Sequence, residues 1–177
     1  MTTFETALEL VTDELRAALT AVDMKQMHNI IDVLESTDVW FCGGQGRSGL
    51  VAKMTATRLM HLGREVHVIG ETTTPAIAAG DGALIVSASG RTETSVAHAR
   101  AAKDLHAVVA VVTSSMDSPL AAIGDVAVIV PTAASQQFGG SLFEQATLIL
   151  LDTVILALEG NFNQARAAMH ARHANLE

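Results

Sequence analysis

Five short runs rich in valine and isoleucine, separated by stretches with helical spacing, restrict the possible folds of this chain more than any other feature. The runs lie at 39–43, 65–70, 83–89, 107–113 and 126–130, with helical stretches at 48–62, 93–105 and 118–123 between them. Most runs are continuously apolar, which is typical of strands covered on both faces. The alternation predicts an α/β fold: a three-layer α/β/α sandwich built on a five-stranded parallel sheet.

Further helices are expected on both sides of this region. Apolar residues at helical spacing occupy about 2–36, with a break at 36–38, and a long apolar helix is expected from Ser141 to about Glu159. A shorter helix should cover about 162–172. The sequence contains no repeat or linker, so we expect residues 1–177 to form a single domain, with N-terminal helices at about 2–36 and a C-terminal helical tail at about 141–177.

The long apolar helix also raises the question of its partners. Because it is apolar around nearly its whole circumference, it should pack in the core or against another subunit. Its most apolar part, 146–158, is too short to span a bilayer and contains Asp152. The start of the chain has an acid where a signal peptide has basic residues. We therefore expect a cytoplasmic protein with no membrane partner.

Charge and aromatic content argue against nucleic acid as a partner. The net charge is −8, so a polyphosphate backbone would be repelled on average. Aromatic residues make up only 3% of the chain and tyrosine is absent, which leaves few platforms for base stacking. The single cysteine, Cys42, ends an apolar run and is interpreted as a small buried hydrophobe.

The loop after the first strand contains a glycine pattern that is typical of dinucleotide binding. Gly44, Gly46 and Gly49 form G-x-G-x-x-G between the strand and the next helix, and Glu71 lies where a ribose-binding acid would be expected. However, five strands leave no second half to meet a dinucleotide. A Walker loop is excluded because no lysine follows the last glycine.

Arg47 and Ser48 occupy the variable positions of this glycine pattern. They offer a guanidinium and a hydroxyl at the point where ligands bind in parallel sheets, beyond the carboxyl ends of the strands. The alternative is a solvated arginine beside a serine that caps the helix. The residue types alone leave both interpretations open.

The loop after the third strand has the composition of a phosphate site. The segment "SASGRTETS" offers the hydroxyls of Ser87, Ser89 and Thr92, a tight turn at Gly90 and the start of a helix. Hydroxyls together with free amides at a positive helix end suit a dianion. The alternative is that Thr92 only caps the helix while the serines fill a turn. We expect Ser87, Ser89, Gly90, Arg91 and Thr92 to bind substrate.

The loop before the long helix carries a candidate base. Ser141 and Glu144 have the spacing of a capping box, which by itself would explain both residues. The functional alternative is that Glu144, at the mouth of the crevice, acts as a general base. His170 and His173 lie in the tail, where no cysteine or acid at ligand spacing supports a metal site. On spacing alone, we interpret both histidines as solvated residues of the tail.

Several segments together resemble the 6-phospho-3-hexuloisomerase family of the sugar isomerase (SIS) domain superfamily. The resemblance runs from about residue 38 to 177 and is carried by "GRSGLVAKMTATRLMHLG", "VIGETTTPAI", "SASGRTETS", "GSLFEQATLILLD" and "RHANLE". It implies a flavodoxin-like sheet, a homotetramer and conversion of D-arabino-3-hexulose 6-phosphate to fructose 6-phosphate. That step belongs to the ribulose monophosphate pathway of formaldehyde fixation, so functional coupling to hexulose-phosphate synthase is also implied.

The resemblance also implies roles for individual residues. Glu144 matches the proposed catalytic base, and His173 matches a histidine that reaches an active site shared between subunits. Arg47 and His173 are candidates for stabilising the enediolate. Gln45 replaces a residue that is usually shorter in the family. The hydroxyls that match the phosphate-binding positions are Ser48, Ser87, Ser89 and Thr92.

Three alternatives to this function are left open. The chain could isomerise a different sugar phosphate, or bind one as a sensor without turning it over. The glycine pattern keeps a dinucleotide-dependent oxidoreductase as the third. The isomerase mechanism needs one carboxylate working through an enediol, so we expect neither a metal nor a cofactor.

Overall fold

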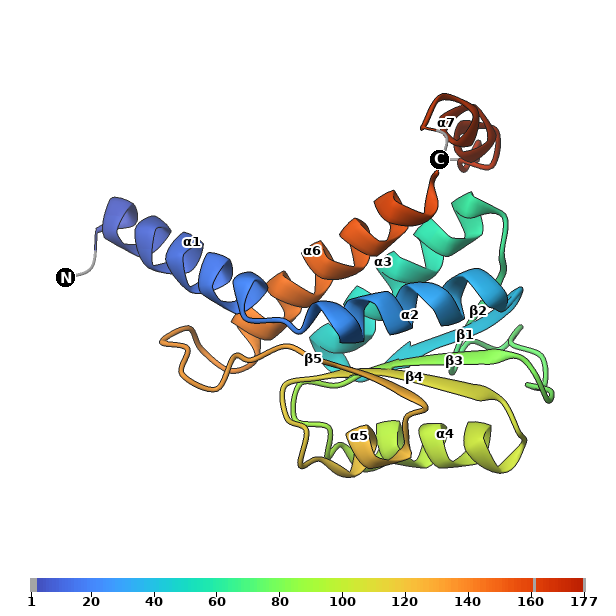
Figure 1. The fold of residues 1–177 in the computed structure, drawn as a ribbon, viewed down its shortest axis with the longest axis horizontal. Helices are drawn as coiled ribbons and strands as arrows, with labels where there is room; N and C mark the ends of the chain where they lie inside the picture. Colours follow the sequence, from blue (N-terminus) through green and yellow to red (C-terminus); the bar gives the residue numbers. More distant parts are fainter. Residues whose placement is uncertain (1–2, 161, 177) are drawn as a thin grey trace.

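A parallel sheet of five strands in the order β2-β1-β3-β4-β5 forms the centre of the structure, a computed structural model that describes residues 3–160 and 162–176 (Figure 1). The strands are β1 (Val39–Gly44), β2 (Glu65–Val68), β3 (Gly82–Val86), β4 (Val108–Thr113) and β5 (Val126–Ile129). The helices are α1 (Phe4–Thr20), α2 (Met24–Ser36), α3 (Gly46–Leu62), α4 (Glu93–Asp104), α5 (Pro119–Ile123), α6 (Ser141–Leu158) and α7 (Phe162–Ala171). The predicted α/β class, strand number and parallel pairing are confirmed.

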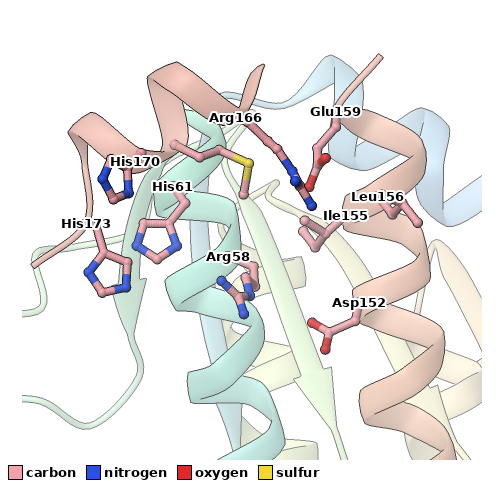
Figure 2. A pocket seen from close by; sticks show the side chains of 10 residues that line it. Arg58, His61, Asp152, Ile155, Leu156, Glu159, Arg166, His170 and His173 are labelled. Carbon is pink, nitrogen blue, oxygen red and sulfur yellow. The ribbon is translucent and has the colours of Figure 1, made fainter. Parts of the chain in front are cut away.

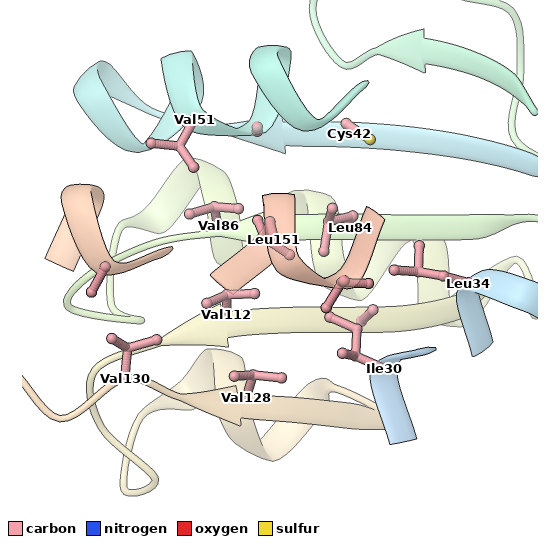
Figure 3. Packing of buried hydrophobic residues seen from close by; sticks show 14 of the residues in the cluster. Ile30, Leu34, Cys42, Val51, Leu84, Val86, Val112, Val128, Val130 and Leu151 are labelled. Atoms are coloured by element: carbon pink, nitrogen blue, oxygen red, sulfur yellow. The ribbon is translucent and has the colours of Figure 1, made fainter. Parts of the chain in front are cut away.

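Alternate side chains of each central strand enter two separate cores. Figure 3 shows the first core, where α2, α3 and α6 cover the sheet. Its members include Ile30, Leu34, Val51, Leu151, Val86, Val112 and Val128. The second core, on the opposite face, is smaller and joins Ile85 and Val111 to α4 and α5 through Ala99 and Leu120. Burial on both faces explains why the strands are continuously apolar.

The N-terminal helices expected at about 2–36 correspond to α1 and α2, and Asp23 between them caps α2 by accepting a hydrogen bond from the Lys25 amide at 2.7 Å. Two strand ends differ from the sequence-based expectation. Strand β2 ends at Val68, since Gly70 turns the chain with a φ of +95°. Strand β3 ends at Val86, three residues early, and this releases Ser87 and the residues after it to form a loop.

Helix α6 packs against α1, α2 and α3 with one face only. Leu142, Phe143, Leu151 and Val154 are buried, whereas Ile149 and Leu156 on the other side are exposed. Among the described residues it is the one helix long and apolar enough to cross a membrane, by length and composition alone. Because one face of α6 is buried against other helices, its apolar composition is explained by its place in the core.

The strand order places the candidate loops at one point of the sheet. From β1 the chain passes to β2 on one side, and β3 lies on the other side, so the winding direction reverses between β1 and β3. Ligands bind at such a reversal, beyond the carboxyl ends of the strands. The loops that leave β1 and β3 both lie there, and Figure 1 shows the start of α6 at the same end.

Candidate functional site

Arg47 and Glu144 face each other at the carboxyl end of the sheet. Arg47 lies in the first turn of α3 and Glu144 in the first turn of α6, and the Arg47 Nε donates to the Glu144 Oε2 in a short ion pair. The Glu144 side chain is only 12% exposed, whereas that of Arg47 is 66% exposed. The pair therefore combines a shielded carboxylate, a candidate proton acceptor, with an exposed cation that balances its charge.

Glu144 does not form the capping box that its spacing suggests. The N-cap of α6 is Gly140 rather than Ser141, and it makes no side-chain capping bond. The Ser141 hydroxyl instead donates to the Phe138 carbonyl at 2.9 Å. The capping-box interpretation is therefore wrong, because the helix begins one residue too early for it. The Glu144 carboxylate is directed across to α3.

Ser48 is not the cap of α3 either. The N-cap is Gln45, without a side-chain capping bond, and Ser48 lies two residues inside the helix, 7% exposed. A Cβ on Gly44, the last residue of β1, would lie 2.6 Å from the Val86 carbonyl oxygen of β3 and 3.0 Å from the Gly49 amide nitrogen of α3. Only glycine allows this approach. The first turn of α3, which contains Ser48, therefore lies directly against the carboxyl ends of β1 and β3.

The loop at 87–92 gathers hydroxyls and amides around a tight turn. The Ser87 hydroxyl donates to the Thr92 Oγ1 at 3.4 Å, and the Arg91 amide donates to the Ser89 Oγ at 3.2 Å. Thr92 is the N-cap of α4 by position, but its side chain makes no capping bond. The helix therefore begins without the side-chain cap of the alternative interpretation, and its first amides suit an anion.

The neighbouring loop at 114–118 holds the 87–92 loop in shape. The Ser114 hydroxyl donates to the Ala88 carbonyl at 2.7 Å, and the Arg91 guanidinium donates to the Asp117 carbonyl at 2.8 Å. Arg91 therefore braces these two loops. Sequence reasoning missed this second loop, although its polar composition, "TSSMDS", directly follows a buried strand and could have indicated it.

Gly140 connects the two halves of the site. A Cβ on this residue would lie 3.2 Å from the Glu144 Oε1 and 3.6 Å from the Cβ of Ala88. The candidate base is therefore a near neighbour of the 87–92 loop. The arrangement brings a hydroxyl-rich loop close to a shielded carboxylate that is paired with a guanidinium.

His173 lies away from this crevice, beside His61 near the C-terminal end of α3. Its ring stacks on that of His61 with 5.3 Å between centroids (Figure 2). The Arg172 Nη1 donates to the His61 carbonyl at 3.1 Å. Burial lowers the pKa of His61, and the charges of His173 and Arg58 lower it further. A cavity of about 570 Å³ at this place is also lined by Asp152 and Leu156.

The two ends of α3 therefore carry different parts of the expected site. Arg47 and His61 are 14 positions apart, which is about 21 Å along a helix axis. Within one chain, the structure does not bring His173 to Glu144. Its position agrees with solvated or subunit-bridging roles rather than with a contact in its own crevice.

The described residues outside this crevice offer no cofactor or metal ligand set. Glu71, the acid that a dinucleotide would need, pairs with Lys53 at 2.6 Å, and this hydrogen bond lowers the pKa of Glu71. Within residues 3–160 and 162–176, no three His, Cys, Asp or Glu side chains are grouped to hold a metal ion. Cys42 is buried, and burial raises the pKa of its thiol to about 12, so it is not a reactive ligand.

Comparison with known proteins places this geometry among sugar isomerase domains. Residues 35–157 match the SIS domain family. The chain is 42% identical to a Mycobacterium gastri protein named 3-hexulose-6-phosphate isomerase. The alignment covers 96% of this chain and 89% of that protein. It is 36% identical to the Bacillus subtilis protein of that name, with 100% of both chains covered.

A solved structure shows the same fold. It belongs to a Methanococcus jannaschii protein that is 29% identical, with a TM-score of 0.87 and coverage of 97% of this chain and 99% of that one. That crystal structure was used to infer that the Methanococcus jannaschii protein is a 3-hexulose-6-phosphate isomerase.

Proposed function

Because this chain belongs to the SIS domain family, we propose that it is a 3-hexulose-6-phosphate isomerase, which converts D-arabino-3-hexulose 6-phosphate to fructose 6-phosphate. One observation supports the site: the shielded carboxylate of Glu144 lies beside the hydroxyl-rich 87–92 loop and is paired with Arg47. In this proposal Glu144 is the base, Arg47 is the cation and the 87–92 loop binds the phosphate of one small ligand.

The reaction moves a carbonyl group between neighbouring carbons. Glu144 removes the proton at C2 of the 3-ketose, and the resulting 2,3-enediol takes a proton at C3, while the hydroxyl proton moves from O2 to O3. One carboxylate placed over both carbons can carry out both carbon transfers, in the manner of general acid–base catalysis. Arg47, released from its ion pair by the substrate, stabilises the negative charge on the enediolate oxygens.

The phosphate of the substrate is held by the 87–92 loop. Ser87, Ser89 and Thr92 supply hydroxyls, and the start of α4 supplies amides and a positive dipole end. Ser48 adds a hydroxyl from the first turn of α3. Binding energy at this remote group positions the reacting carbons under the base, so it contributes to rate as well as affinity.

Removing hydroxyls from this loop should weaken substrate binding first. The double variant Ser89→Ala with Thr92→Ala is expected to raise KM more than it lowers kcat, since it leaves the Arg47–Glu144 pair untouched. Steady-state kinetics would measure this, with Thr94→Ala, an exposed position on α4, as the control. Unchanged KM and kcat/KM would count against the phosphate loop.

A coupled assay tests the function directly. Purified protein is given the aldol product of formaldehyde and ribulose 5-phosphate, and the appearance of fructose 6-phosphate is followed through a dehydrogenase. Turnover of a different sugar phosphate alone would assign another substrate. Thermal stabilisation by sugar phosphates without any turnover would make the protein a sensor.

We also propose that the active site is completed by a second copy of the chain in a homo-oligomer, as in a tetramer. Residues of α3 and α6 line two separate pockets, one beside Arg47 and Glu144 and one beside His61 and Asp152. Leu50 and Met54 at the first pocket and Leu156 at the second are at least half exposed. An isologous partner lying antiparallel across both pockets would bring its own His173 end over Glu144.

Subunit complementation distinguishes a shared site from a self-contained one. Glu144→Gln and His173→Ala oligomers are each expected to be weakly active. After dissociation and joint reassembly, mixed oligomers contain sites with one intact Glu144 and the other chain's intact His173, so activity should return. No recovery in mixtures that light scattering shows to be reassembled would contradict sharing.

The remaining functional expectations follow from this assignment. We place the protein in the cytoplasm, where its phosphorylated substrate is formed and kept. Functional coupling to the hexulose-phosphate synthase that supplies the ketose is part of the same proposal.

A further inference from the structure

We propose that Glu14, on the N-terminal helix α1, is a positioning residue for catalysis: it fixes the 131–140 loop, and the loop fixes the start of α6 and the Glu144 carboxylate. This inference rests on the proposed role of Glu144 as the base. Glu14 itself does not touch the crevice residues described above. It would act through the loop.

The Glu14 carboxylate binds three consecutive residues of the loop. Its Oε1 accepts a hydrogen bond from the Gln136 amide at 2.6 Å. Its Oε2 accepts from the Ser135 hydroxyl at 2.8 Å and from the Gln137 Nε2 at 3.0 Å. One of the donors is a main-chain group, so the contact fixes the path of the backbone as well as two side chains.

The loop leads directly to the base. The Gln137 amide donates to the Ser135 Oγ at 3.0 Å, and the Ser141 hydroxyl donates to the Phe138 carbonyl at 2.9 Å. The Glu144 amide then donates to the Gly140 carbonyl at 3.0 Å. A chain of short-range hydrogen bonds therefore joins the residues held by Glu14 to the first turn of α6.

Packing alone does not hold this loop. Phe138 at its tip is 96% exposed, and Gly139 adopts a φ of +62° with no atom near the place of a Cβ. A cavity of about 430 Å³ lies between the loop and α1, lined by Ala17, Ala21 and Leu142 among others. Without the Glu14 hydrogen bonds, the loop has room to move.

The anchoring side is itself well fixed. Helix α1, which carries Glu14, packs directly on α6, the helix that carries Glu144. At the other end of the loop, the Gln26 Oε1 on α2 accepts a hydrogen bond from the Ile129 amide at 2.8 Å, where β5 ends. The Gln136 amide, the Ser135 hydroxyl and the Gln137 amide group lower the pKa of Glu14, which favours the carboxylate form.

Kinetics of Glu14 variants test the proposal. In Glu14→Ala we expect kcat to fall by about tenfold to a hundredfold, since small displacements of a reacting group have effects of this size, while KM is unchanged. Glu14→Gln keeps one oxygen for the Gln136 amide and should be intermediate. The control is Glu9→Ala, which removes an exposed carboxylate from the same helix.

The contact can also be broken from the loop side. Ser135→Ala with Gln137→Ala removes two of the three donors and leaves α1 unchanged, so it should reproduce the loss of kcat even if Glu14→Ala fails to fold. Hydrogen exchange of amides 136–140 should be faster in both variants. Folded variants with the kcat and exchange of the wild type would overturn the proposal.

The same experiments separate this inference from the proposed function. If the wild type does not turn over the 3-hexulose phosphate, the function fails, and amide exchange alone decides whether Glu14 holds the loop. If Glu14→Ala lowers the melting temperature but leaves kcat at the wild-type value, Glu14 is structural only and its positioning role is wrong.

Discussion

The Glu144→Gln enzyme is expected to lose kcat by about 10²–10⁴-fold, the usual contribution of a general base. Glutamine has the same shape and can still accept the Arg47 hydrogen bond through its amide oxygen, so the crevice should keep its geometry. It cannot take a proton from C2. Substrate binding, which we assign to the 87–92 loop, should therefore be nearly unchanged.

Single-turnover kinetics and equilibrium binding of substrate would separate these two effects. The matched control is Glu71→Gln, which also neutralises a carboxylate paired with a cation of α3, at a different place. It should retain normal turnover. A Glu144→Gln enzyme with near-normal kcat would show that another group is the base.

A Gly90→Ala variant should have the second-largest effect, on both stability and substrate binding. Gly90 has a φ of +60°, and a Cβ there would lie 2.3 Å from the Ser118 Oγ and 2.7 Å from the Thr113 Oγ1. The left-handed conformation costs about 1–2 kcal/mol in a non-glycine residue. Overpacking against the buried Ser118 and Thr113 adds about 1–3 kcal/mol, or displaces the loop.

Denaturant unfolding and KM would measure the two consequences. The control is Gly46→Ala, where φ is +58° and no atom lies within 4 Å of the added Cβ. The Gly46→Ala variant should lose only the unfolding free energy that corresponds to a left-handed conformation in a non-glycine residue. Equal losses in the two variants would mean that the contact with Ser118 and Thr113 does not restrict the loop.

The strands and most helices could be predicted because their signals are local. A continuously apolar run such as 107–113 can satisfy its environment only between two layers of helices, and β4 lies there. More than one helix was expected at about 2–36, but the point of division at Asp23 was not predicted, because apolar spacing continues across it. The capping residue itself was a usable signal.

The candidate site was predictable by residue type but not by contact. Glu144 was identified together with a competing capping box, and only the helix start at Ser141, with Gly140 as its cap, excluded that alternative. The Arg47–Glu144 pair joins residues 97 positions apart, and no local pattern encodes such a pair. The 114–118 loop could be recognised by its polar composition, but its contacts with Arg91 and the Ala88 carbonyl join residues 26 positions apart, which no local pattern encodes.

The sequence by itself determined the layered α/β architecture and the hydroxyl-rich loop, because apolar periodicity and glycine turns act over a few neighbouring residues. Only the tertiary structure decided which distant groups meet: Arg47 with Glu144, Glu14 with the 135–137 segment, and His173 with His61 rather than with the base. Such contacts depend on how whole helices lie across the sheet. That arrangement is set by the packing of many side chains together.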